Sequence, residues 1–331
     1  MAGKITFDRS AWKRISGRDA FGMALAQMGG ENKNIVVLVA DCMETTKGSL
    51  FAARFPERAF NFGIAEANMV SAAAGMTLLG KLPVIAGFGF LMSMRIAEQV
   101  RTDICYPRLN VKIVASATGL AMGTGGPTHH CTEDIAIMRS FPNIAIVCPG
   151  SSIETWKATW AAVLDYEGPV YLRMERNAYL KEVEDIYEGK DIPFELGKSI
   201  TLREGKEVTI IGTGKPVGLA LQAAEALEKD GISARVINMH TVKPIDMEPI
   251  KKAAEETRGI VAVEEHNTVG GLGDAISSTV CENGLPTLVK KVGICDEFCC
   301  IGPTDEVWER HGLTKNSIVT AAKGIMDRRY K

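Results

Sequence analysis

A carboxylate among small apolar residues is the first feature of the sequence that could do chemistry. Glu66 lies within segment 63–68 (Gly-Ile-Ala-Glu-Ala-Asn), at the start of a predicted helix. Segment 88–90 (Phe-Gly-Phe) offers aromatic faces, and the glycine-rich segment 123–129 ends in His129. These three groups could share a site for binding and proton transfer. A carboxylate in the first turn of a helix also serves simply to complement the helix dipole, and this alternative stays open.

The elements that would position these groups are short apolar strands separated by helices. Continuous apolar runs of this kind indicate a parallel sheet covered on both faces, and they lie at 35–40, 83–88, 111–116, 144–149 and 169–174. Helices are expected at 65–80 and 94–105. Because loops beyond the carboxyl ends of parallel strands converge on one crevice, we expect Glu66, the aromatic segment and His129 to lie together.

A second, smaller α/β domain is expected in the remainder of the chain. The polar stretch 177–198 carries many charges and a proline, which is typical of a linker. Alternation then resumes, with strands at 208–214, 234–239, 260–265 and 289–294 and a helix at 219–229. The predicted domains are 1–180 and 205–331, joined by a linker at 181–204.

Composition excludes several classes of protein. The chain has 331 residues, 46% hydrophobic and 24% charged, which fits two globular domains at roughly 150 residues each and excludes disorder. With 38 Lys and Arg against 40 Asp and Glu, there is no basic excess for nucleic acid or an anionic membrane. Apolar runs are far shorter than the roughly 18 residues of a membrane span, and the start lacks a signal-peptide core. We therefore expect a cytoplasmic protein with neither partner.

Two glycine motifs have ordinary structural explanations. Segment 212–214 (Gly-Thr-Gly) follows a strand, but Gly218 comes one residue late for a dinucleotide-binding turn, so a close-packed turn is favoured. Segment 270–273 (Gly-Gly-Leu-Gly) could cradle an anion or simply form a loop with positive φ, and both remain open.

The cysteines and histidines do not predict a metal site. Eight cysteines are too sparse for a disulfide scaffold, so we expect them reduced and mostly buried. Cys295, Cys299 and Cys300 do not have the spacing of a common ligand pattern. Segment 129–131 (His-His-Cys) has suitable atoms for zinc, but no second ligand pair lies near it in sequence, so a substrate-contacting loop is favoured.

The order of these motifs resembles the carboxyl-terminal half of a transketolase, a thiamine-diphosphate enzyme that moves two-carbon ketol units. Segment 63–76 (GIAEANMVSAAAGM) is similar to the family's carboxylate-bearing segment, 83–88 to its aromatic platform, and 125–150 to its substrate loop with the following helix and strand. Segment 208–275 resembles the transketolase C-terminal domain. The resemblance covers nearly all of the chain and implies a pyrimidine-binding domain followed by a C-terminal domain.

One family motif is missing. The family holds the cofactor diphosphate through a metal at a Gly-Asp-Gly motif, which the sequence lacks, and the chain begins almost at the pyrimidine-binding domain. The resemblance therefore implies the C-terminal subunit of a split transketolase. Its partner would be an N-terminal subunit carrying the diphosphate-binding domain and Mg2+ (or Ca2+), in an α2β2 assembly with thiamine diphosphate at the interface.

The resemblance also implies roles for the cofactor-binding residues. Glu66 corresponds to the carboxylate that hydrogen-bonds the pyrimidine ring and assists loss of a proton from the cofactor's reactive carbon. We expect apolar neighbours such as Ile64 to favour its protonated form. Phe88 falls at the stacking position, Leu91 replaces a common aromatic, and Asp41 matches a position near the cofactor, where its role could be purely structural.

Substrate residues follow from the same resemblance. Arg18, Thr45 and Arg176 match positions that contact a phosphate, which suits a guanidinium, and His129 matches the histidine that contacts the ketose hydroxyls or carbonyl oxygen. A surface or interface ion pair is the alternative for each of the first three.

Two departures from the family pattern affect the expected substrate. Gly125 replaces an Asp that contacts a sugar hydroxyl, and Ala117 replaces a phosphate-contacting His. A site that loses a hydrogen-bonding group changes its selectivity at that position. We therefore expect a ketose with a terminal anion that differs from an ordinary sugar phosphate, for instance a modified or branched sugar.

Three other functions are compatible with parts of the sequence. A β subunit of a 2-oxoacid dehydrogenase has a similar pair of domains, but the Gly-Pro-Thr-His sequence of the loop favours transketolase. Half of a 1-deoxyxylulose-5-phosphate synthase is disfavoured because that enzyme is normally one chain. A non-catalytic regulatory subunit would not need Glu66.

Overall fold

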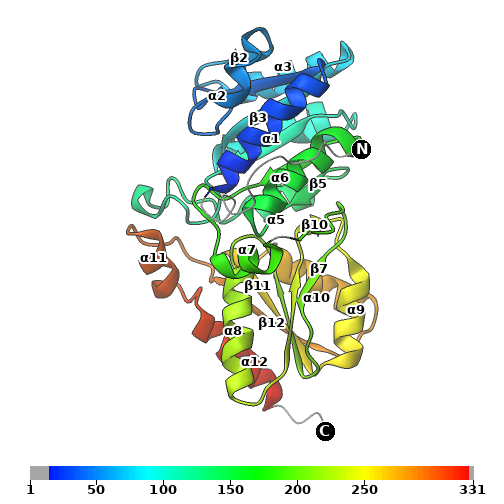
Figure 1. Cartoon of the computed structure of the whole chain (residues 1–331), viewed down its shortest axis with the longest axis vertical. Coiled ribbons are helices and arrows are strands. Elements are labelled where there is room, and N and C mark those ends of the chain that lie inside the picture. The colour runs from blue at the N-terminus through cyan, green and yellow to red at the C-terminus, as the bar shows by residue number, and fades with distance from the viewer. Residues whose placement is uncertain (1–14, 189, 328–331) are drawn as a thin grey trace.

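The computed structural model describes residues 15–188 and 190–327, which form two α/β domains stacked along the long axis of the molecule (Figure 1). One domain is built on a seven-stranded sheet and the other on a five-stranded sheet. Two domains with mostly parallel sheets confirm the predicted fold class.

The sheet of the first domain has the strand order β10-β5-β6-β4-β3-β1-β2. Its strands are β1 Ile35–Val39, β2 Ala59–Asn61, β3 Leu82–Phe88, β4 Lys112–Ser116, β5 Ala145–Val147, β6 Val170–Arg173 and β10 Thr241–Lys243. All neighbours are parallel except β10 and β5. The central strands are buried almost throughout, as the apolar runs predicted.

Helices cover both faces of this sheet, because the residues of a central strand point alternately to the two faces and are apolar on both. Alternate residues of β1 face opposite ways: Ile35 and Val37 join one core cluster, and Val36 and Leu38 join the other. The first cluster includes α1 and α6, and the second includes α3 and α5. The helices of this half are α1 Gly17–Glu31, α2 Ser49–Ala52, η2 Pro56–Arg58, α3 Glu66–Leu78, η3 Leu91–Arg95, α4 Ala97–Gln99, η4 Val100–Cys105, η5 Gly123–Gly125, α5 Asp134–Ser140, α6 Ser152–Trp160, η6 Ala161–Asp165 and α7 Lys181–Tyr187.

The second sheet has the order β12-β11-β8-β9-β7. Its strands are β7 Ile200–Arg203, β8 Val208–Gly212, β9 Ala234–Asn238, β11 Gly259–Asn267 and β12 Leu288–Ile294; its helices are α8 Val217–Lys229, α9 Met247–Glu256, α10 Leu272–Glu282, α11 Thr304–Arg310 and α12 Lys315–Met326. Only β7 runs antiparallel to its neighbour. The segment predicted as a linker contains α7 and β7.

The two domains are joined by more than the chain. Strand β10 comes from the second half of the sequence yet pairs with β5 at the edge of the first sheet. Beside it, Lys243 donates a hydrogen bond to the carbonyl of Arg139, at 2.9 Å. The contact fixes the carboxyl edge of the second sheet against the first domain (Figure 1).

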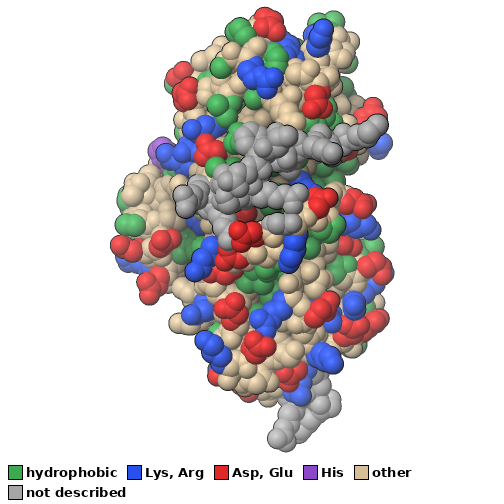
Figure 2. Space-filling view, in the orientation of Figure 1, with side chains coloured by type: hydrophobic (Ala, Val, Ile, Leu, Met, Phe, Trp, Pro, Cys, Tyr) green, Lys and Arg blue, Asp and Glu red, His purple; other side chains and the backbone are tan. Residues whose placement is uncertain are grey.

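The visible surface mixes charges of both signs, with Lys and Arg interspersed among Asp and Glu (Figure 2). Within the described ranges, no helix is long and apolar enough to cross a bilayer.

Candidate active site

The parallel sheet brings the predicted site residues to one edge of the first domain. Each follows the carboxyl end of a strand, except Arg18, which lies in the first turn of α1. Because α1 leads into β1, its amino end lies at that same edge. The residues are Arg18 before β1, Asp41 and Thr45 after β1, Glu66 after β2, Phe88 and Leu91 at the end of β3, His129 after β4, and Arg176 after β6.

Glu66 is the first residue of α3 and is 3% exposed. Its carboxylate is bound by Arg95, whose Nη1 lies 3.0 Å from Oε1 and 2.9 Å from Oε2. The Arg95 side chain is 49% exposed, so the pair opens toward solvent on the arginine side. Ile64, expected among the apolar neighbours, is instead exposed. Glu66 is therefore buried as expected, but Ile64 does not cover it, and a cation pairs with its carboxylate.

Aromatic rings connect Glu66's neighbourhood to the substrate loop. Phe88 ends β3 and stacks on Phe90 with ring centroids 6.0 Å apart. Phe90 in turn lies 5.3 Å from the His129 ring. Leu91 begins η3, the same short helix that ends at Arg95. One segment, 88–95, therefore carries both the aromatic surface and the partner of Glu66.

Asp41 lies beside the segment that leads into α3. Its φ is +53°, and its backbone N–H donates to Oδ1 of Asn61, which also accepts from the N–H of Gly63. The neighbouring Cys42 is buried, and burial raises the pKa of its thiol to about 11, with a further contribution from the carboxylates of Glu66 and Asp41. The carboxylates of Glu66 and Asp41 thus both raise the pKa of the buried Cys42 thiol, although the Asp41 side chain itself is exposed.

The residues predicted to bind a terminal anion lie in the first turn of α1 and on the segments that follow β1 and β6. Arg18 Nη1 donates to the backbone carbonyl of Thr45 at 3.4 Å. Gly17 is in close contact with the backbone of Glu175, next to Arg176, since a Cβ on Gly17 would lie 2.9 Å from the Glu175 carbonyl oxygen. Within the described part of the chain, the buried Nε of Arg18 has no hydrogen-bond partner. The backbone segments that carry Arg18 and Arg176 therefore lie side by side, and the Arg18 guanidinium keeps an unused donor.

Gly125 and His129 occupy adjoining space. A Cβ on Gly125 would lie 2.8 Å from Cβ and 2.9 Å from Cγ of His129, closer than side chains approach in proteins. Nδ1 of His129 lies 3.0 Å from the hydroxyl of Thr128. The other departure, Ala117, is fully buried with φ +55° at the end of β4. Glycine at position 125 therefore leaves free the space that the His129 side chain occupies.

The remaining candidates are the cysteines and histidines considered as metal ligands. In the described ranges, no three His, Cys, Asp or Glu side chains are grouped to hold a metal ion. Cys295 is exposed, Cys299 is buried and Cys300 is partly buried, all with free thiols. Within segment 129–131, His130 and Cys131 are buried and His129 is partly exposed.

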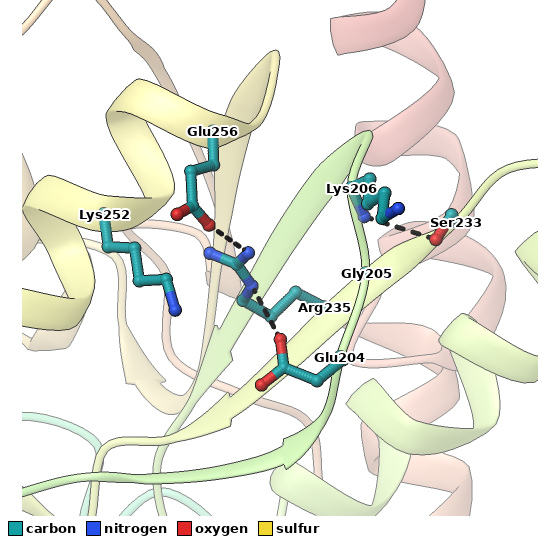
Figure 3. A pocket seen from close by; sticks show the side chains of 7 residues that line it. All are labelled: Glu204, Gly205, Lys206, Ser233, Arg235, Lys252 and Glu256. Atoms are coloured by element: carbon teal, nitrogen blue, oxygen red, sulfur yellow. Dashed lines mark hydrogen bonds and ion pairs between the residues drawn. The ribbon is translucent and has the colours of Figure 1, made fainter.

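A cavity of about 670 Å³ lies at the amino end of the second sheet (Figure 3). Its central side chain, Arg235, lies between the carboxylates of Glu204 and Glu256. The arginine is therefore already paired, and the arrangement is that of a structural ion-pair cluster.

Arg95 is the site residue that sequence reasoning missed. It lies 29 positions from Glu66, within a stretch predicted only as a helix, so no local pattern joins the two. The only available signal was that a basic residue, Arg95, follows soon after the aromatic segment 88–90.

Comparison with known proteins agrees with this geometry. The family model for the transketolase pyrimidine-binding domain matches residues 13–181, and the model for the transketolase C-terminal domain matches residues 197–318. The chain belongs to the transketolase family. This confirms the family resemblance and the identity of the two domain types.

Relatives of this transketolase-family chain include separate subunits. It is 38% identical to a 6-deoxy-6-sulfo-D-fructose transketolase subunit of Clostridium sp., covering 94% of this chain and 95% of that protein. It is 39% identical to an apulose-4-phosphate transketolase subunit of Phocaeicola vulgatus, covering 93% and 96%. A solved structure described as a split-gene transketolase, an inactive β4 tetramer, superimposes with a TM-score of 0.84 at 40% identity, covering 95% of this chain and 98% of that one. The chain is thus similar to separate transketolase subunits over nearly the whole length of both.

Proposed function

We propose that this chain is the C-terminal subunit of a two-chain, thiamine-diphosphate-dependent transketolase. It would transfer a two-carbon ketol unit from a ketose with a terminal anion to an aldose acceptor. The observation that carries the proposal is the buried Glu66 carboxylate at the edge of the sheet that also presents Phe88, Phe90 and His129. The names of the similar subunits support the same reaction class.

The residues present fit one end of the cofactor. A buried carboxylate with a half-exposed partner and an aromatic surface suit a pyrimidine ring, so Glu66, Phe88, Leu91 and Asp41 would hold that end. When bound, thiamine diphosphate supplies the carbon nucleophile that takes up the ketol unit. The diphosphate and its Mg2+ (or Ca2+) would be held by the N-terminal partner subunit, in an α2β2 assembly.

Residues of this chain would bind and orient the sugars. Glu66 would hold a proton at the pyrimidine nitrogen, which requires that Arg95 release at least one carboxylate oxygen. His129, fixed beside Phe90, would orient a hydroxyl or carbonyl oxygen of the ketose. Arg18, in the first turn of α1 and bonded to the Thr45 carbonyl, and Arg176, after β6, would bind the terminal anion.

Partner dependence can be tested by calorimetry. The isolated chain, titrated with thiamine diphosphate and Mg2+, is expected to bind the cofactor poorly because it lacks the diphosphate anchor. Adding the partner chain, recognised by its Gly-Asp-Gly motif, should restore both binding and activity. Tight stoichiometric binding by the chain alone would contradict the split-enzyme proposal.

The donor is proposed to be a non-standard ketose. Gly125 and Ala117 remove two polar side chains, while both arginines that suit a terminal anion remain. The named substrates of two relatives, a sulfo-sugar and apulose 4-phosphate, belong to this class. A panel of ketose donors compared by kcat/KM in the assembled enzyme tests the proposal. If xylulose 5-phosphate or fructose 6-phosphate is the best donor, Gly125 and Ala117 do not change the selectivity for the donor.

A further inference from the structure

The loop that carries His129 is a closed structure. We define the substrate loop as residues 117–131. Its ends are joined by two backbone hydrogen bonds between Gly119 and Cys131, at 3.0 and 2.8 Å, and His129 N–H donates to the Gly126 carbonyl at 2.8 Å. Because these bonds tie the loop to itself, the position of His129 depends on what anchors the loop as a whole.

The second domain holds this loop at Leu120. The Leu120 N–H donates to Oε1 of Glu265 at 2.9 Å, and the Leu120 carbonyl accepts a hydrogen bond from the Thr304 hydroxyl at 3.1 Å. Trp308 donates through Nε1 to the same Glu265 oxygen, at 2.7 Å. Thr304 and Trp308 belong to α11, which lies on the side of the second domain nearest the first (Figure 1). Both polar groups of one buried residue are thus bonded across the domain interface.

Gly119 makes room for this contact. A Cβ at position 119 would lie 2.3 Å from both Cδ and Oε2 of Glu265, and φ at this glycine is +59°. A side chain here would be strained by the backbone and would displace the carboxylate. The loop backbone and Glu265 therefore fit together only because residue 119 is glycine.

A neighbouring carboxylate shows that the contact is specific to Glu265. Glu264 is on the same strand, β11, and is equally buried. It accepts hydrogen bonds from the N–H groups of Leu272 and Gly273, at 2.6 and 2.8 Å, within its own domain. Two successive residues thus have the same chemistry, but only one reaches across to the substrate loop.

We propose that Glu265 and Thr304 are positioning residues that anchor the substrate loop at Leu120 and so determine where His129 stands. The C-terminal domain then acts on the site without contributing a group that touches the substrate. The anchoring stands on the contacts above; its consequence for the ketose rests on the proposed function.

Hydrogen exchange of the isolated full chain tests the anchoring. In Glu265→Ala, backbone amides within 117–131 should exchange about tenfold faster or more, because the Leu120 N–H loses its acceptor. Glu265→Gln should keep near-normal protection, since an amide oxygen can accept the same two bonds. The matched control, Glu264→Ala, should speed exchange near 272–273 and leave 117–131 unchanged.

A second variant guards against loss of folding. Thr304→Val keeps the shape of the side chain and removes only the hydroxyl bond to Leu120, so faster exchange confined to the substrate loop is expected. Unchanged exchange in the loop of folded Glu265→Ala overturns the anchoring. If that variant does not fold, unchanged exchange in Thr304→Val overturns it.

Kinetics of the enzyme assembled with its partner test the effect on His129. Glu265→Ala should raise KM for the best donor of the panel about tenfold while leaving the Kd for thiamine diphosphate unchanged, and Glu265→Gln should restore KM. If Glu265→Ala speeds hydrogen exchange in the substrate loop but leaves KM for the donor unchanged, the positioning role is refuted. If the wild-type assembly shows no ketol transfer while the exchange results hold, the proposed function fails and the anchoring stands.

Discussion

The carboxyl edges of the two sheets carry similar side chains in different surroundings. At the first edge, Glu66 is paired with a half-exposed arginine and His129 is partly exposed. At the second edge, Glu264, Glu265 and His266 are buried, and the protein itself supplies their hydrogen bonds. The second edge is covered by the first domain, whereas at the first edge Arg95 and His129 stay accessible to solvent. We therefore expect a buried carboxylate to take part in catalysis only where its partner can move away from it.

The largest expected difference between the two edges is in turnover. Glu66→Ala should lower kcat of the assembled enzyme by about two to four orders of magnitude, the usual cost of losing a proton-transfer group. Its melting temperature should change little, because the remaining Arg95 is half exposed. Near-normal turnover together with a much lower melting temperature would identify Glu66 as a helix-terminal stabiliser instead.

The same comparison shows what the sequence could predict. Apolar runs located the central strands of both sheets, since a strand buried on both faces requires uninterrupted apolar residues, but they missed the edge strands β2, β7 and β10. The convergence of loops beyond the carboxyl ends of parallel strands then predicted that Glu66, Phe88 and His129 lie at one edge, without any contact information. These predictions depend on local pattern and on general properties of parallel sheets.

Features that depend on distant partners were not predictable in this way. Strand β10 has only three residues and joins a sheet from the other half of the chain. Arg95 meets Glu66, and Glu265 meets Leu120 across 145 positions, only because tertiary packing brings them together. With a single sequence, nothing in residue type or spacing distinguishes Glu265 from Glu264.

Burial of Glu265 at the second edge should make the free energy of unfolding depend on pH. Burial, reinforced by the nearby Glu175 carboxylate, raises the pKa of Glu265, whereas Lys215 and Arg173 act in the opposite direction. A carboxyl with a raised pKa in the folded state contributes stability at low pH that is lost as pH rises from the unfolded value toward the folded one. Glu265→Gln should therefore gain stability relative to wild type by about 1–2 kcal/mol between pH 5 and pH 8.

Urea unfolding of both proteins at the two pH values measures this gain, and Glu57→Gln, at an exposed carboxylate, is the control. A wild-type-to-variant difference that is equal at pH 5 and pH 8 would mean that the protonation of Glu265 does not change on folding.

The smallest expected effect concerns the Glu66–Arg95 pair itself. Arg95→Gln leaves a buried carboxylate without its cation, which destabilises the fold, but the arginine is half exposed and solvent screens the interaction. We expect a loss of about 1 kcal/mol in the free energy of unfolding at neutral pH. In the double variant Glu66→Gln with Arg95→Gln, the loss should largely disappear, because no unpaired charge remains.

Arg101→Gln, at an exposed arginine on the adjoining η4, controls for removal of a positive charge. Additive single effects in this double-mutant cycle would show that the two side chains do not interact. The open edge would then hold its carboxylate by burial alone, and the contrast with Glu265 would reduce to solvent access.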